Sequence, residues 1–450
     1  MVKRDNFETL AGCEGLFRLQ RRQALQIASA TAGGFWMTRL AEKLSVAAER
    51  SKSDRPKSLL VLWCQGGPSQ LETFDPHPGT RIGGEVAAID SSIAGVQLAE
   101  TMPALAEQMN RVCLIRSMIS REGDHERATS YLKTGWRPDP TVIHPSIGSI
   151  LCYASPSNLE IPRHVSILSS QWPSRGGYLG PAWDAFKSQD PKDPIPHLTA
   201  TSSADRQDRR QGLLEIMEDE FQEGRIAGLD QNRTLHRTAT QRAVKMMSSQ
   251  QLAAFDVKQE SQSLRLSFGD SPFGRGCLAA VRLLETGVRC VEVELNGWDS
   301  HINNHQLQSA NASILDAALA ATLKELVERE LFEDTIVMCG GEFGRTPRIN
   351  SASGRDHWPH GFSMMLAGGR LRRGYVHGST NSNPSDELLR ANSVDSAGLA
   401  QLVQDPVGVE DLHATVLTAL GVDPTDQRVT PIGRPLAWSE GQAISQLLES

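Results

Sequence analysis

The chain has 450 residues, of which 22% are charged, and its formal net charge at pH 7 is −7. A net negative charge argues against a nucleic-acid-binding protein, because phosphate backbones are bound by basic surfaces. Beyond the N-terminal region, no stretch approaches the ~18 consecutive apolar residues that a membrane-spanning helix needs. A chain of this length can bury a large core without disulfides, so we expect its cysteines to be core thiols.

The N-terminal region is typical of an export signal. A polar stretch is followed by the adjacent arginines Arg21 and Arg22 and then by a weakly apolar run, with the small residues Ser45 and Ala47 further on. We therefore expect residues 1–47 to be a signal peptide read by the twin-arginine translocase, and the mature protein to be periplasmic or secreted, without a membrane span. Its removal takes away seven basic and four acidic residues, which changes the formal net charge from −7 to −10. The alternative is an ordinary amphipathic N-terminal helix.

Short apolar runs recur along the rest of the chain, after a charged linker at residues 48–57. A continuous apolar run is typical of a strand buried on both faces of a parallel sheet. Helix-like segments separate several of these runs, and this alternation favours an α/β fold with a doubly wound, mostly parallel sheet flanked by helices. The predicted strands are 58–64, 112–115, 165–168, 288–295, 335–339 and 362–367, and the clearest predicted helices are 276–286, 310–329 and 411–420.

The domain organisation is predicted to be simple. The sequence contains neither an internal repeat nor a low-complexity linker after residue 57, so we expect one elaborated core over residues 58–440. Residues 203–265 differ from the rest because they are charged, rich in glutamine and poor in strand-forming residues. This composition predicts a helical insertion within the core.

Side chains that can carry chemistry follow the ends of several predicted strands. In a parallel sheet, ligands bind where loops leave the carboxyl ends of the strands, so residues at these positions are the first candidates for a site. We expect these loops to converge on one edge of the sheet. The candidates are Gln65 after the first strand, Asp299, His301 and His305 after the 288–295 strand, Glu342 and Arg345 after the 335–339 strand, and His357 and His360 before the 362–367 strand.

A carboxylate together with imidazoles is the donor set of a zinc, manganese or iron site. If a helix begins at Asp299, then His301 and His305 lie four residues apart on one of its faces. Asp299 could instead only cap that helix, and His305 could cap it or face solvent. Spacing alone does not rank His357 against His360.

Two further features concern the binding of an anion. Glu342 and Arg345 could pair with each other across a turn, or Arg345 could grip a tetrahedral anion beside the metal. Residues 123–135 are predicted to be a loop that passes into a helix beginning near His125. Such a helix start offers free N–H groups and the positive end of the helix dipole to an anion, although a plain capped helix is the alternative.

Long motifs in this chain resemble those of a large exported bacterial family of unknown function. That family is assigned to the alkaline-phosphatase-like superfamily, which also contains the sulfatases, and the resemblance implies an alkaline-phosphatase-like core. It extends in order from about Ser58 to Pro435. The motifs are CQGGPSQLETFDPHP, GWDSH, GEFGRTP, DHWPHGFSMMLAGG and DLHATVLTALGVD, together with the pair Thr134-Gly135.

The chain departs from the pattern of this superfamily at key positions. The enzymes it resembles use two metal ions and a nucleophile that opens a helix ten residues before the glycine of a Thr-Gly pair. Here that position is His125, where phosphatases have Ser or Thr and sulfatases a modified Cys or Ser. Gln65 corresponds to the superfamily's first metal-binding Asp, and Glu342-Phe343 to a later Asp-His pair. His125 and Glu342 could therefore form a second, unusual metal site.

The resemblance and the residues together lead us to expect a metal-dependent hydrolase of phosphate or sulfate esters, including those of sulfated or phosphorylated glycans. Its divalent metal is expected to be zinc, with manganese or iron as alternatives. The alternatives in function are a catalytically silent relative that binds an anionic glycan and a structural protein of the envelope. The expected metal ligands are Asp299, His301, Glu342, His357 and His360, and the expected catalytic residues are His125 and Arg345.

Replacement of Arg21 and Arg22 by lysines should trap the precursor in the cytoplasm, because the translocase reads the arginine pair. The measurement is the ratio of precursor to processed protein in cell fractions. If the variant is processed and exported as well as the wild type, the twin-arginine assignment is wrong.

Overall fold

The computed structural model describes residues 57–155, 159–196, 198, 203–220, 240, 243–390 and 394–449. The signal peptide expected at 1–47, and all of the expected linker except Lys57, lie outside the described residues. The described part belongs to one compact unit that spans Pro56–Ser450. None of its helices is long and apolar enough to cross a membrane.

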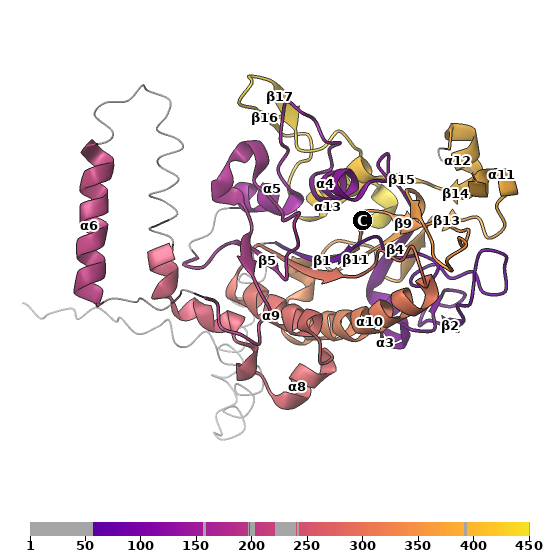
Figure 1. Ribbon diagram of the computed structural model, residues 1–450, viewed down its shortest axis with the longest axis horizontal. Helices are drawn as coiled ribbons and strands as arrows, with labels where there is room; N and C mark the ends of the chain where they lie inside the picture. The colour runs from indigo at the N-terminus through magenta and orange to yellow at the C-terminus, as the bar shows by residue number, and fades with distance from the viewer. Residues whose placement is uncertain are drawn as a thin grey trace, which may run out of the picture. The chain divides into compact units, whose positions relative to one another are not determined.

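A central sheet of nine strands organises the described residues, in the order β12-β4-β11-β8-β1-β7-β5-β6, with β15 paired to β4 (Figure 1). Neighbouring strands are parallel except that β11 runs antiparallel to both β4 and β8. All six predicted strands lie in this sheet, which confirms the mostly parallel α/β fold. The strands are β1 (Ser58–Gln65), β4 (Val112–Ile119), β5 (His164–Ile167), β6 (Phe186–Ser188), β7 (Cys290–Asn296), β8 (Thr335–Gly340), β11 (His360–Ala367), β12 (Tyr375–His377) and β15 (Val407–Gly408).

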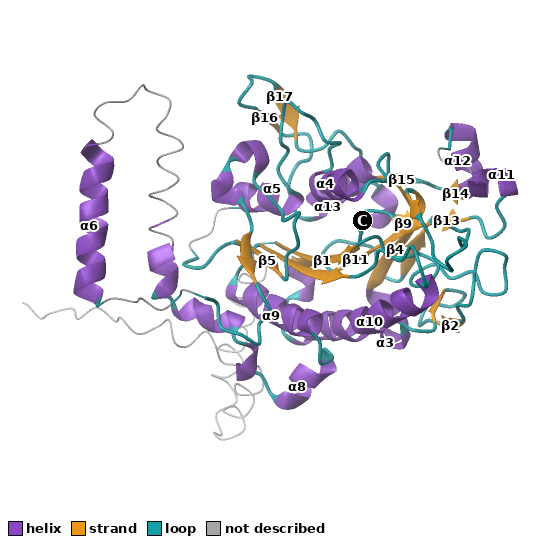
Figure 2. Ribbon diagram, viewed as in Figure 1, coloured by secondary structure: helices purple, strands orange, loops and turns teal. Residues whose placement is uncertain are grey.

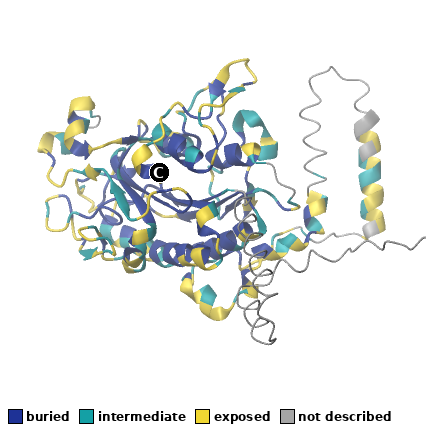
Figure 3. Ribbon diagram, turned by 180° about the vertical axis from the view of Figure 1, so that it is seen from behind, coloured by how far each residue is buried: buried dark blue, intermediate teal, exposed yellow. Residues whose placement is uncertain are grey.

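The sheet is buried on both faces, because successive side chains of a strand point to opposite sides. In β1, Leu60 and Leu62 belong to one apolar core and Leu59 and Val61 to another. Helices cover both faces (Figure 2), and the strands between them are buried (Figure 3). The first core includes side chains of α3 (Pro103–Gln108), α9 (Pro272–Thr286) and α10 (Asn304–Glu328), and the second those of α4 (His125–Thr134), α5 (Ile147–Ala154) and α13 (Val409–Ala419).

Smaller elements complete the described part of the chain. The two-stranded sheets are β2 (Ala88–Asp90) with β3 (Gln97–Ala99), β9 (Gly344–Arg345) with β10 (His357–Trp358), β13 (Ser379–Thr380) with β14 (Val403–Gln404), and β16 (Gln427–Val429) with β17 (Pro435–Ala437). The other α-helices are α6 (Ala204–Glu220), α8 (Gln262–Ser267), α11 (Asp386–Arg390) and α12 (Ser396–Leu402).

The expected helical insertion at 203–265 contains α6, most of α8 and two short 3₁₀ helices, η5 (Gln250–Phe255) and η6 (Val257–Gln259). Phe255 and Val257 are buried in the core that α9 and α10 share. The described residues of this stretch are thus helical, and its interpretation as an insertion stays a prediction. The six cysteines after the signal region are buried free thiols: Cys64, Cys113, Cys152, Cys277, Cys290 and Cys339.

The three clearest predicted helices all begin earlier in the structure, at Pro272 instead of 276, at Asn304 instead of 310 and at Val409 instead of 411. Helix α9 begins earlier, at Pro272, because Ser271 caps it by accepting a hydrogen bond from Gly274 N. Helix α10 does not begin at Asp299 but at Asn304, after Asn303 in a left-handed conformation. Asp299 is therefore not its N-cap.

Helix α4 begins at His125, as the sequence predicted, and packs on α13 at its other end. Asp124 caps the start by accepting from the N–H groups of Glu126 and Arg127. At the end, Gly135 has φ +76°, and a Cβ there would lie 2.7 Å from Cγ of His413. Buried His413 donates from Nε2 to the carbonyl of Leu132 at 2.7 Å. Gly135 is thus required both by its backbone conformation and by the close approach of His413.

Burial lowers the pKa of His413 to about 4. In the unfolded chain an imidazole titrates near 6.5, so the unfolded state takes up a proton first as the pH falls, and the folded state loses stability between pH 6.5 and 4. The free energy of unfolding should therefore be about 2 kcal/mol lower at pH 5 than at pH 7 because of His413. Urea unfolding of the wild type and of His413→Gln at both pH values measures this difference, and the variant should lose less stability on acidification than the wild type.

Candidate metal centre

The loops converge on one edge of the sheet. Gln65 ends β1, Asp299 follows β7 and Glu342 follows β8, so these residues lie at the carboxyl ends of neighbouring parallel strands. Helix α4, which begins at His125, follows β4. His357 precedes β11, and because β11 is antiparallel to its neighbours its start lies at the same edge.

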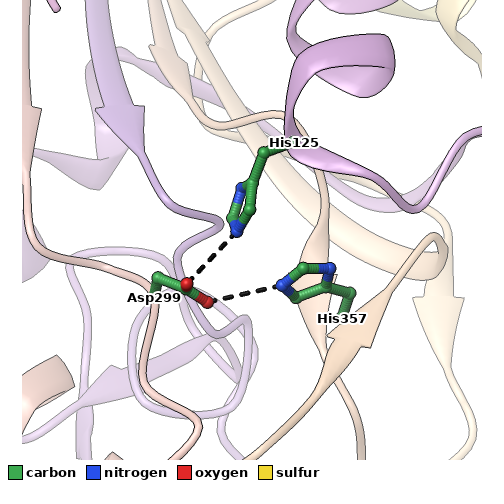
Figure 4. A group of neighbouring side chains, drawn as sticks. All are labelled: His125, Asp299 and His357. Carbon is green, nitrogen blue, oxygen red and sulfur yellow. Dashed lines mark hydrogen bonds and ion pairs between the residues drawn. The ribbon is translucent and has the colours of Figure 1, made fainter.

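The carboxylate of Asp299 lies at the centre of the cluster, between His125 and His357 (Figure 4). Its Oδ2 is 3.3 Å from Nε2 of His125, and its Oδ1 is 3.4 Å from Nε2 of His357. These three residues offer ligand atoms that lie within 4.8 Å of one another. His301 joins them, with its Nε2 3.1 Å from Asp299 Oδ1 and 3.0 Å from His357 Nε2.

Each of the three imidazoles is held at its other nitrogen by a group that only accepts hydrogen bonds. His125 Nδ1 bonds to Oε1 of Glu342 at 2.7 Å, and His301 Nδ1 bonds to Oδ1 of Asp356 at 2.8 Å. His357 Nδ1 bonds to the carbonyl of Gly123 at 2.8 Å. This network assigns a proton to Nδ1 of each ring, so Nε2 of the neutral ring is the nitrogen that could bind a metal.

This arrangement fits a divalent metal ion. Donor atoms about 2.0–2.1 Å from a tetrahedral ion lie about 3.3 Å apart, and the separations between Asp299 and the Nε2 atoms are 3.1–3.4 Å. Nε2 of His125 is buried without a hydrogen-bond partner among the described residues. When both rings are neutral with the proton on Nδ1, the facing Nε2 atoms of His301 and His357 both present lone pairs, which a cation between them would bind. A carboxylate with imidazoles is the donor set that zinc prefers.

Arg345 keeps Asp299, and burial keeps His357, in the form that a metal binds. Partial burial opposes the ionisation of Asp299, but the hydrogen bond and the charge of Arg345 hold its pKa below the ordinary value. Burial lowers the pKa of His357, which favours the neutral imidazole.

Glu342 contacts His125. Its side chain is fully buried, and its Oε1 accepts hydrogen bonds from His125 Nδ1, from Gln65 Nε2 at 3.0 Å and from Gly66 N at 2.9 Å. These contacts orient His125, whereas Oε2 of Glu342 is buried without a hydrogen-bond partner among the described residues, so its role as a metal ligand stays a prediction. Gln65, at the position that resembles a metal-binding Asp, supports Glu342 instead.

Arg345 also differs from its expected role of gripping an anion. The guanidinium is fully buried and donates to Asp299 Oδ1 at 2.7 Å, to Gly67 O at 3.0 Å, to Arg355 O at 3.2 Å and to Gly66 O. Four of its five N–H groups are thereby used inside the protein. Arg345 therefore positions Asp299 and the loop after β1, and its planar fork is not free to bind a ligand.

The remaining candidates lie apart from the central cluster. His360 begins β11, and its ring meets Trp358 edge-on at 5.2 Å, so His357 rather than His360 contacts Asp299. His305 lies within α10, whereas His301 precedes that helix, so the two do not share a helix face as expected.

Sequence reasoning did not find the residues that hold His301 in place. Asn350 Nδ2 donates to the carbonyl of His301 at 3.0 Å, and a Cβ at Gly354 would lie 1.8 Å from that same oxygen. Asp356 was visible only as part of the motif DHWPH. The segment 346–356 between β9 and β10 thus packs against the His301 backbone, and the order of residues along the chain gives no signal of this contact.

The fold and this cluster define an α/β protein with a candidate metal centre at the carboxyl edge of its sheet. The chain belongs to the family described as "Protein of unknown function (DUF1501)", whose model matches residues 56–448. A comparison with curated proteins found no match.

Solved structures that resemble the chain do so at low identity. A protein in the alkaline phosphatase superfamily from Vibrio parahaemolyticus is 12% identical, with 82% of this chain and 67% of that chain covered and a TM-score of 0.34. The PsFucS1 sulfatase from Pseudoalteromonas sp. is 12% identical, with 85% and 71% covered and a TM-score of 0.40. The C-terminal periplasmic domain of EcEptC from Escherichia coli, a complex with zinc, is 9% identical, with 88% and 92% covered and a TM-score of 0.36.

His301→Ala should weaken zinc binding by more than about 100-fold, because it removes a nitrogen donor, whereas His305→Ala should leave it unchanged. Zinc content by mass spectrometry and affinity by chelator competition measure the difference. Equal zinc affinity in the two variants would show that His301 is not a ligand.

Proposed function

We propose that the protein is an exported, metal-dependent hydrolase of phosphate or sulfate esters. The observation that carries this proposal is the approach of three imidazole Nε2 atoms to the Asp299 carboxylate, each with its Nδ1 held by an acceptor. Zinc is the preferred ion, with manganese or iron as alternatives. Export rests on the arginine pair of the N-terminal region alone.

Asp299, His301 and His357 would hold the ion, and three protein ligands leave a position for water or substrate. When bound, a divalent ion polarises an ester oxygen and lowers the pKa of water. His125 would then take part in the reaction itself instead of binding the ion.

Glu342 accepts from Nδ1 of His125, so the Nε2 atom faces Asp299 and the place where the ester would lie. A carboxylate–imidazole pair of this kind can accept a proton from an attacking water, or attack phosphorus or sulfur directly. His125 opens α4, and the positive end of the helix dipole favours an anion nearby, although Asp124 already accepts from the N–H groups of Glu126 and Arg127.

A specific observation favours a second candidate, the catalytically silent relative that binds an anionic glycan. If His125 is the fourth metal ligand, the site is closed, and four protein ligands are typical of structural zinc. The buried, fully engaged Arg345 also leaves no arginine fork for the anion among the residues of this cluster.

Two variants separate these functions. His125→Ala should lower kcat for an aryl phosphate or aryl sulfate by about 10²–10⁴-fold, because it removes the group that handles the proton, while zinc stays bound. Asp299→Ala should abolish both zinc binding and turnover. Zinc content and turnover are measured on the same samples, with His305→Ala as the control.

If His125→Ala releases the zinc, His125 is a ligand and the closed site is favoured. If neither variant changes the rate, the observed turnover does not come from this centre, and the silent relative is the better reading.

A further inference from the structure

An indole ring lies beside the candidate metal centre without being part of it. The ring of Trp172 is nearly parallel to that of His125, with 16° between their planes and 6.4 Å between their centroids. Trp172 is partly exposed and belongs to the loop that follows β5. Among the residues that the structure describes, its indole N–H has no hydrogen-bond partner.

A buried ion pair supports this indole. Nζ of Lys133, in the last turn of α4, lies 2.9 Å from Oε1 of Glu292 in β7, and both side chains are buried. Burial opposes the ionisation of Glu292, but Lys133 holds its pKa below the ordinary value. A buried ion pair adds little net stability, because the cost of desolvation offsets the attraction. We therefore ascribe to this ion pair the positioning of the loop that carries Trp172.

The ion pair and its neighbour Glu294 fix the loop that carries Trp172. Three residues of this loop form hydrogen bonds with Glu292 or Glu294 of β7 or with Lys133 of α4. The three contacts are Ser170 N to Glu294 Oε2 at 3.1 Å, Lys133 Nζ to the Trp172 carbonyl at 2.8 Å, and Ser174 Oγ to Glu292 Oε2 at 2.7 Å. These contacts fix the backbone of the loop at Ser170 and Trp172, beside the candidate metal centre.

We propose that Trp172 is the platform on which the sugar ring of a carbohydrate ester stacks while its phosphate or sulfate group lies at the metal centre. This inference rests on the proposed function. The C–H face of a pyranose packs on an indole, whose N–H remains available for a hydroxyl group.

Two probes that differ only in the sugar test this inference on the zinc-loaded full chain. They are 6-deoxy-6-phosphonoglucose, a sugar phosphonate that cannot be hydrolysed as an ester, and methylphosphonate. We expect the wild type to bind the sugar phosphonate about tenfold more tightly in isothermal titration. Trp172→Ala should remove this preference and leave zinc content and methylphosphonate affinity unchanged, and Trp172→Phe should restore part of it.

Trp183 provides the matched control, because it is also partly exposed but contacts Tyr153 and Arg163 instead of His125. Trp183→Ala should keep the preference for the sugar phosphonate. The inference is overturned if the wild type shows no preference, or if Trp172→Ala weakens both probes equally, since the residue would then only support the centre. Binding of neither probe would overturn the proposed function as well, whereas tight sugar binding without turnover of sugar esters would overturn the hydrolase alone.

Discussion

The ion pair between Asp299 and Arg345 is the interaction on which the candidate centre depends. Arg345 is fully buried, and its Nη2 lies 2.7 Å from Oδ1 of an Asp299 side chain that remains partly exposed. A buried guanidinium needs a partner and hydrogen-bond acceptors, and here Asp299 and the carbonyls of Gly66, Gly67 and Arg355 supply them. The position of the carboxylate is thereby tied to the loops after β1 and β7.

Around this carboxylate, each imidazole depends on a different segment of the chain. Glu342 orients His125 from the loop after β8, Asp356 orients His301, and the Gly123 carbonyl orients His357. These acceptors come from loops that are far apart in sequence and meet only because the strands end at one edge of the sheet. Loss of one of these acceptors would therefore let an imidazole turn away from Asp299. Hydrogen bonds to the nitrogen of an imidazole that does not face the metal strongly affect metal affinity.

The differences from the superfamily that this chain resembles are connected with one another. Gln65 stands where a metal-binding Asp is expected, and it donates to Glu342, which in turn holds His125 at the expected place of the nucleophile. A neutral amide beside a buried carboxylate avoids the repulsion of two negative charges. The three residues thus form one hydrogen-bonded unit that orients an imidazole at the start of α4.

The sequence by itself determined six of the nine strands of the central sheet, the polar loops after them and the helix that begins at His125, because these depend on local apolar patterns and on capping by Asp124. Only the tertiary structure decided between His357 and His360. His357 lies three residues before the start of β11 and reaches Asp299, whereas His360 is already paired with Ile119 within the sheet. The roles of Glu342 and Arg345 were likewise decided by contacts with residues more than 200 positions away, at Gly66 and Gly67. Such contacts form when loops from separate strands meet, and local periodicity carries no information about which groups will meet there.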